Sequence, residues 1–179
     1  MVEVLRSRAI FRLRTWLPEH ASGAKPLALG GAELPREVGR TRAGPIRIAC
    51  VAPGEWLIVT TRDRVGETID LVESEASKQG LVLADVSDAY STFEIRSPAA
   101  RELLSKGCGL DLHPSEFPLG RCARTRFAQL AVVLECTGED LFELTCGRSY
   151  ERYLREWLDD AAMAVTASPT PPRTSRSHS

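Results

Sequence analysis

The sequence predicts an α+β fold of two small α/β lobes, each a mostly antiparallel sheet with packed helices. Short runs rich in β-branched and aromatic residues alternate apolar and polar positions, which is typical of half-buried strands. Three stretches repeat apolar residues every three or four positions, which is typical of amphipathic helices. Their order is strand-strand-helix-strand, followed by a similar arrangement of one strand, a helix, three strands and a helix.

Length and composition are those of an ordinary folded domain. The 179 residues fall within the roughly 100–200 expected of one domain, and 43% of them are hydrophobic. We therefore expect one compact domain over residues 1–165, and a division into lobes of about 1–90 and 91–165 is left open. The stretch 166–179 is rich in Ser, Thr, Pro and Arg and is expected to be a disordered tail.

The even distribution of charge disfavours nucleic-acid and membrane partners. The 23 basic and 24 acidic residues are spread along the chain, so no strong field draws in polyanions or anionic lipid. No run approaches the ~18 apolar residues of a membrane helix. The Arg-rich start contains Glu3 and little Ser, which argues against a transit peptide. A cytoplasmic protein is expected.

The first half is expected to form one sheet with one helix. Arginines alternate with apolar residues over 6–14 and predict a strand. The Gly- and Pro-rich stretch 18–45 predicts a long irregular connection, which either wraps over the surface or is ordered by a partner. Residues 46–51 and 56–60 predict a hairpin. An apolar stripe then predicts a helix from Val65 to Ala76.

Capping residues and apolar alternation predict the helices and strands of the rest of the chain. Ser97 as N-cap and Pro98 as first helical residue predict a short helix that Gly107 ends. A last helix starts after Ser149, and its aromatic residues are assigned to the core. The expected strands are 81–86, 90–96, 122–127, 130–135 and 141–146.

The cysteines predict neither disulfides nor a metal site. They are odd in number and contain no Cys-x-x-Cys pair, and no histidine lies at a usual ligand spacing from them. Reduced, buried thiols are expected. The five residues are Cys50, Cys108, Cys122, Cys136 and Cys146.

The densest group of reactive residues follows the short helix. Lys106 could assist a Cys108 thiolate, and Asp111 and His113 could form an acid–base pair on an extended segment. No third group that orients a base is identifiable, so a structural turn is preferred. No catalytic, cofactor-binding or metal-binding residue is therefore assigned.

Two further groups of residues have both a structural and a functional interpretation. Asp85 and Asp88 flank Ser87, and such residues commonly satisfy backbone N–H groups at a turn. Trp56 is interpreted as an exposed aromatic contact or, with equal weight, as a core residue. The candidate partner interface consists of Trp56, Leu112, His113 and Phe117.

Four stretches resemble the γ subunit of heterotetrameric sarcosine oxidase. They are Pro-Gly-Glu-Trp-Leu at 53–57, Ala-Asp-Val-Ser-Asp at 84–88, Ser-Lys-Gly-Cys-Gly-Leu-Asp-Leu-His-Pro at 105–114 with Phe117 and Gly120, and Arg-Ser-Tyr at 148–150. The resemblance covers roughly residues 45–162, and the run from Lys106 is its most specific part.

That family is itself similar to the folate-binding part of the glycine cleavage T-protein, around residues 85–100 here, which implies a folate-binding, aminomethyltransferase-like fold. In the T-protein a Gly-Gly-x-x-Asp-Asp-like stretch places an acidic residue at the folate amine. The corresponding residues 127–134 contain no carboxylate. Without it, aminomethyl transfer has no electrostatic partner on this chain.

The resemblance implies a noncatalytic γ subunit that packs on the large folate-binding subunit and supports assembly with the α, β and δ subunits. The complete enzyme demethylates sarcosine to glycine with tetrahydrofolate and oxygen, and FAD, FMN and NAD lie on other subunits.

The alternative is a stand-alone folate-binding or aminomethyltransferase-like protein that uses Asp85, Cys108 or Asp111. A weaker alternative is an iron–sulphur assembly protein, because Lys-Gly-Cys echoes a motif of that class. In the iron–sulphur assembly proteins the Lys-Gly-Cys motif is followed by Tyr-x-Gly-Gln-Glu, which this chain lacks.

Overall fold

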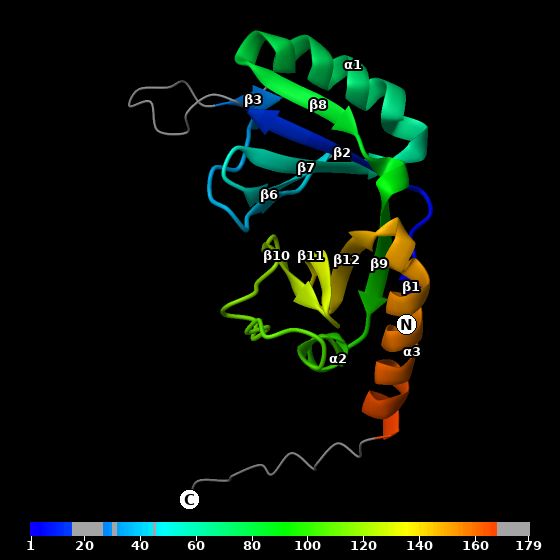
Figure 1. Cartoon of the computed structure of the whole chain (residues 1–179). Coiled ribbons are helices and arrows are strands. Elements are labelled where there is room, and N and C mark those ends of the chain that lie inside the picture. Colours follow the sequence, from blue (N-terminus) through cyan, green and yellow to red (C-terminus); the bar gives the residue numbers. More distant parts are fainter. Residues whose placement is uncertain (16–26, 30–31, 45, 168–179) are drawn as a thin grey trace, which may run out of the picture.

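The computed structural model describes residues 1–15, 27–29, 32–44 and 46–167 (Figure 1). Within them the chain forms two five-stranded antiparallel sheets, one two-stranded sheet and three α-helices. The predicted α+β class with mostly antiparallel sheets and packed helices is confirmed.

The first sheet, sheet B, has the strand order β5-β6-β7-β2-β8. Its alternate residues Phe11, Leu13 and Ile58 are buried against one another and against the apolar stripe of α1 (Val65–Ala76). These residues form one hydrophobic core of the molecule. The strands are β2 (Arg8–Thr15), β5 (Thr41–Arg42), β6 (Arg47–Ala52), β7 (Glu55–Thr61) and β8 (Leu81–Asp85).

The second sheet, sheet A, has the order β1-β9-β12-β11-β10. Its outer face buries Phe93, Leu134 and Leu144 against α2 (Ala100–Ser105) and α3 (Glu151–Ala167), which form a second core. The strands are β1 (Val2–Val4), β9 (Tyr90–Arg96), β10 (Cys122–Phe127), β11 (Leu130–Gly138) and β12 (Leu141–Gly147).

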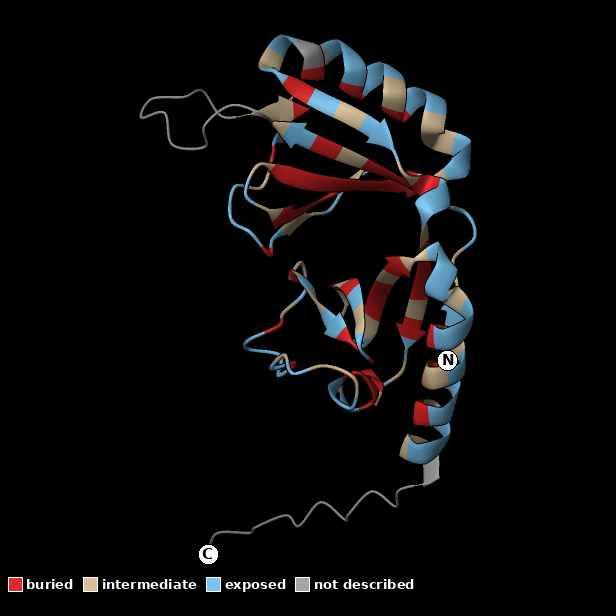
Figure 2. Cartoon of the chain, viewed as in Figure 1, coloured by how far each residue is buried: buried red, intermediate tan, exposed pale blue. Residues whose placement is uncertain are grey.

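The two sheets stack with their other faces toward each other, so α1 and the pair α2 and α3 form the outer layers (Figure 1). Figure 2 shows buried positions along both sheets and exposed residues on the outer sides of α1 and α3. A small apolar cluster that includes Ile10, Leu57 and Cys122 fills part of the space between the sheets. Ion-paired side chains from both sheets also lie in that space.

The predicted helix boundaries shift at two places. Ala100 N donates to Ser97 O, and Ala99 N donates to Ser97 Oγ at 3.2 Å, so residues 97–99 form a turn and α2 begins at Ala100. A 3-10 turn over Arg148–Tyr150 contains Ser149, and α3 continues to Ala167. Residues 168–179 of the predicted tail lie outside the described residues.

The stretch 18–45 is partly described. Its described residues form three strands of two residues each, namely β3 (Ala28–Leu29), β4 (Ala32–Glu33) and β5. Leu29 and Leu34 are buried in the core under α1. The described part of this connection therefore packs onto sheet B. Residues 18–26, 30–31 and 45 lie outside the described residues.

Candidate functional site

Four glutamates lie side by side across the inner face of sheet A. The strand register pairs Glu3 with Glu94, Glu94 with Glu143, and Glu143 with Glu135. Adjacent strands are only ~4.8 Å apart, and like charges directly opposite one another destabilise a sheet. Glu135 and Glu143 are buried, at 5% and 3% exposed. This glutamate row needs compensating cations.

Sheet B supplies two of them. Arg47 on β6 places Nε 3.1 Å from Glu135 Oε1, and its Nη1 donates to Glu143 Oε1 at 3.0 Å. Its Nη2 also donates to Glu143 Oε2, which makes the contact bidentate. Arg8 on β2 donates from Nη2 to Glu143 Oε1 at 2.5 Å. The two sheets are therefore joined by ion pairs.

The pKa values of the two buried carboxyls, Glu135 and Glu143, shift in opposite directions. Burial raises the pKa of Glu135 to about 7, with Glu143 adding to the rise and Arg47 opposing it. For Glu143, burial also acts upward, but its hydrogen bonds and ion pairs with Arg47 and Arg8 outweigh it and hold the pKa below the usual range. One carboxyl is thus firmly ionised, and its neighbour exchanges a proton near neutral pH.

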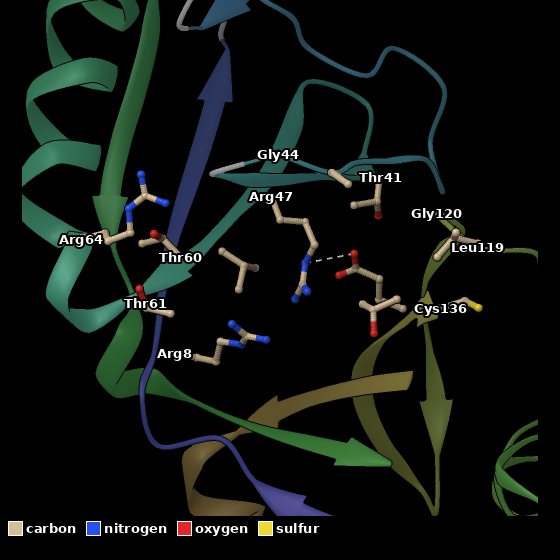
Figure 3. Close-up of a pocket in the computed structure, with 14 residues that line it drawn as sticks. Arg8, Thr41, Gly44, Arg47, Thr60, Thr61, Arg64, Leu119, Gly120 and Cys136 are labelled. Atoms are coloured by element: carbon tan, nitrogen blue, oxygen red, sulfur yellow. Dashed lines mark ion pairs between the residues drawn. The ribbon is translucent and has the colours of Figure 1, made fainter. Parts of the chain in front are cut away.

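A cavity of about 430 Å³ adjoins this network (Figure 3). Three arginines from sheet B and the turn after it, Arg8, Arg47 and Arg64, line it together with Glu135. Its volume lies within the range of small-molecule sites, ≈ 300–1,000 Å³. The arginines suit an anionic group and Glu135 suits a donor, so the walls can orient a polar ligand.

A second ionic group lies elsewhere between the sheets. Glu55 at the start of β7 is 6% exposed. Arg14 donates to its Oε2 from Nε at 3.1 Å and from Nη2 at 2.8 Å, and Arg124 donates to its Oε1 at 2.6 Å. Arg12 Nε lies 3.7 Å from the same Oε1. Burial tends to raise the pKa of Glu55, but the arginines lower it below its ordinary value.

Comparison with known proteins identifies the family. The model of the "Sarcosine oxidase, gamma subunit family" matches residues 18–164. The chain belongs to this family. It is 32% identical over 156 residues to the sarcosine oxidase subunit gamma of Arthrobacter sp., covering 86% of this chain and 75% of that one. It is 28% identical over 155 residues to that of Corynebacterium sp. strain U-96, covering 85% and 74%.

Two solved structures share the fold. A chain of heterotetrameric sarcosine oxidase from Corynebacterium sp. U-96 superposes with a TM-score of 0.80 at 24% identity, covering 96% of this chain and 87% of that one. The glycine cleavage aminomethyltransferase T of Bartonella henselae gives 0.61 at 14% identity, covering 89% and 46%. The predicted relation to the sarcosine oxidase γ subunit and, distantly, to the T-protein is confirmed.

Residues 127–134 were compared with the stretch that carries an acidic residue in the T-protein. An acidic residue, Glu135, follows this range directly on β11. Residues 127–134 lack a carboxylate, but β11 continues to Gly138 and places Glu135 on the inner face. The sequence reasoning missed this residue because the period-2 pattern assigns it to a solvent face. The available signal was Val133, an apolar residue two positions earlier that shares the face of Glu135.

Residues 106–114, the run after α2, form a loop that is held at both ends. Gly107 O accepts from Ala128 N at 2.9 Å, and a Cβ on Gly107 would lie 2.5 Å from the Phe127 ring. Arg101 donates to Leu112 O and, at 3.0 Å, to Phe117 O. The glycine and the arginine thus fix both ends of the loop.

Asp111 and His113 of that loop form hydrogen bonds with neighbouring residues of the same loop. Asp111 Oδ1 accepts from His113 N at 2.8 Å, and His113 Nδ1 lies 2.9 Å from Ser115 Oγ. Cys108 is half-buried, and burial raises the pKa of its thiol. The Asp111 carboxylate therefore holds a turn.

Of the two interpretations of Trp56, the structure supports the core residue and not the exposed contact. Its side chain is 4% exposed and its Nε1 donates to Pro35 O at 2.7 Å, because it faces the core under α1. Leu112 and Phe117 are likewise buried, in the core of sheet A. Of the four proposed interface residues, His113 alone is exposed. A partner contact of these four residues stays a prediction. His113 is the one of the four whose exposed side chain could make such a contact.

The Asp85 to Asp88 turn joins the sheets structurally. Asp85 Oδ1 accepts from Ser87 N at 2.9 Å and from Ser87 Oγ at 2.6 Å. Asp88 is exposed and pairs with Arg62 at 3.2 Å. In this turn the two carboxylates have separate partners.

Four of the five cysteines are buried, and Cys108 is partly buried. Burial raises the pKa of Cys122 and of Cys146 to about 11. Over the described parts of the chain, no three His, Cys, Asp or Glu side chains gather as a metal site would require. No helix in those parts combines the length and the apolar character that crossing a membrane requires.

Proposed function

We propose that this chain is a noncatalytic γ subunit of a cytoplasmic heterotetrameric sarcosine oxidase. The observation that carries the proposal is the family match over residues 18–164. The chain would pack on the large folate-binding subunit and support assembly with the α, β and δ subunits. The assembled enzyme would demethylate sarcosine to glycine with tetrahydrofolate and oxygen.

The electrostatics support a noncatalytic role. Glu55, Glu135 and Glu143 are all ion-paired with arginines, and Cys108 has a raised thiol pKa. An activated nucleophile would instead need a lowered pKa or an adjacent oriented base. The ion pairs thus hold the two sheets together, and Cys108 lacks the lowered pKa of an activated nucleophile.

The dinucleotide cofactors do not fit this chain. Dinucleotides bind where a parallel βαβ unit presents a Gly-rich turn and a helix N-terminus to the pyrophosphate. The strand pairs within the two large sheets described are all antiparallel. The antiparallel sheets support the assignment of FAD and NAD to the partner subunits, and FMN is placed there in this proposal by the family resemblance alone.

The proposal is tested by affinity capture of the tagged full chain from its own cells. Recovery of three further subunits and of flavin absorbance in the eluate is the expected result. Within the recovered complex, Cys108→Ser and His113→Ala should leave sarcosine turnover per flavin unchanged. Isolation of the chain alone would refute the assembly role, and a large loss of turnover in either variant would refute the noncatalytic role.

A second candidate function, a stand-alone folate-binding protein, is favoured by the cavity beside Glu135. A buried carboxyl whose pKa is raised to about 7 and three arginines are features of ligand sites. Calorimetric titration of the chain with tetrahydrofolate tests it. Micromolar binding that Glu135→Gln abolishes and Asp85→Ala retains would favour this function, whereas the γ-subunit proposal predicts no binding.

A further inference from the structure

Four arginines share one side of the space between the sheets. Arg12 and Arg14 are alternate residues of β2, and Arg124 and Arg126 are alternate residues of β10. Alternate residues of a strand point to the same face, and both pairs lie on the inner faces of their sheets. Arg14 and Arg124 come from different sheets yet bind the same Glu55 carboxylate. We call these four residues the arginine cluster.

The cluster carries more positive charge than its surroundings compensate. Glu55 is the carboxylate that pairs with Arg12, Arg14 and Arg124, and Arg126 Nη2 donates to the neutral Gln129 amide oxygen. Arg12 Nε is buried and has no hydrogen-bond partner among the described residues. One negative charge therefore stands against four positive charges.

The cluster is also accessible, unlike Arg47 at the cavity. The side chains of Arg14 and Arg124 are 48% and 43% exposed, whereas that of Arg47 is 17% exposed. Arg126 is exposed as well. Val82 on β8, opposite Arg14 in the sheet, is 51% exposed. The surface therefore presents three exposed guanidinium groups beside an exposed apolar side chain, and Arg is enriched at protein–protein interfaces.

We propose that the arginine cluster docks an acidic segment of a partner subunit in the assembly, with carboxylate side chains bound bidentately by the guanidinium groups. This inference rests on the proposed γ-subunit function and names the surface and its partner's chemistry. Glu55 shows how a carboxylate is bound there, because Arg14 donates through two nitrogens to its Oε2 and Arg124 donates to its Oε1. The chain's own residues after Ala167 include Arg173 and Arg176 and no Asp or Glu, so their charge does not suit this surface.

The test uses the double variant Arg124→Gln/Arg126→Gln and the flavin-bearing partners recovered by affinity capture. These two arginines are chosen because Arg14 and Arg12 remain to neutralise Glu55, and the melting temperature checks that the fold is kept. Binding to the partners should weaken about tenfold at about 0.05 M salt, and the salt dependence of the dissociation constant should become shallower. Arg124→Lys/Arg126→Lys should keep the salt dependence, because it retains the charge, but should keep only part of the affinity, because lysine cannot bind a carboxylate bidentately.

The control is Arg152→Gln/Arg155→Gln on α3, which also removes two arginines but leaves the cluster intact. Unchanged affinity and salt dependence in the cluster variant, with a complex that still forms, would overturn the inference and leave the proposed function standing. A complex that fails to form with the unsubstituted chain would overturn both. Self-association of the chain, or binding of a single-stranded oligonucleotide, that the cluster variant abolishes would assign the surface to another occupant and overturn the inference.

Discussion

Arg47 of β6 and Glu135 of β11 form an ion pair across the two sheets, with Nε 3.1 Å from Oε1 (Figure 3). The same guanidinium binds Glu143 on the neighbouring strand, so one side chain neutralises two adjacent carboxylates. Arg47 itself is largely buried, and its pKa is raised because the two glutamates outweigh the opposing effect of burial. The packing of the sheets therefore depends on this arginine.

Replacing Arg47 with glutamine should destabilise the chain by about 3–5 kcal/mol, because it leaves a buried carboxylate without its main partner. Urea unfolding at neutral pH measures the loss. Arg152→Gln, at a side chain that is 91% exposed, should stay within about 0.5 kcal/mol of the native chain.

Adding Glu143→Gln to Arg47→Gln should recover most of that loss, because the charge that lost its partner is then removed. If the double variant is as unstable as the sum of the single variants, the ion pair does not account for the contact between the sheets.

Glu135 should make the stability fall as pH rises toward neutrality. Its pKa is raised from 4.5 to about 7 in the folded chain, so the folded state keeps a proton that the unfolded state releases. The contribution is fully present below about pH 4.5 and is lost as pH passes through 7, in total about 3 kcal/mol. Glu143, whose pKa is lowered, acts in the opposite direction and only below its ordinary value of 4.5.

Glu135→Gln isolates this effect, because glutamine resembles the protonated acid and does not titrate. The difference in unfolding free energy between variant and native chain should be near zero at pH 5 and should favour the variant at pH 8. An equal difference at both values would contradict the raised pKa.

Gly107→Ala should destabilise the chain by about 1–3 kcal/mol, because the added methyl group meets the buried Phe127 ring. Gly109→Ala is the matched control in the same loop, since no heavy atom lies within 4 Å of its added Cβ. Thermal unfolding of the two variants distinguishes them. Equal melting temperatures would show that the loop can move away from Phe127.

The sequence predicts the local elements well because their signals are local. Alternation over residues 6–14 predicts β2, and the stripe from Val65 to Ala76 predicts α1 to the residue. The edge strand β1 was missed because three residues carry too little pattern. The strands of the 18–45 stretch have only two residues each and depend on pairing with distant segments.

The site between the sheets could not be predicted from the same pattern. Arg8 and Arg12 on one strand, and Glu135 and Glu143 on two others, occupy the polar positions that usually face solvent. Only the stacking of two polar faces brings them together, and a period of two residues does not reveal which polar face is covered. The apolar faces were predictable because burial is the ordinary outcome for Phe93 or Leu144.

The five thiols should react very unequally with Ellman's reagent. Burial raises the pKa of Cys122 and Cys146 to about 11 and also raises that of Cys136, so at pH 8 these residues carry little thiolate and little of it is accessible. Cys108 is only half-buried, although its pKa is also raised, and should supply the single slow reaction of the native chain. Cys108→Ser should remove that reaction, while all remaining thiols become reactive in urea. A fast reaction in the native chain, at a rate above that of free cysteine, would reveal an activated thiolate and contradict the noncatalytic role.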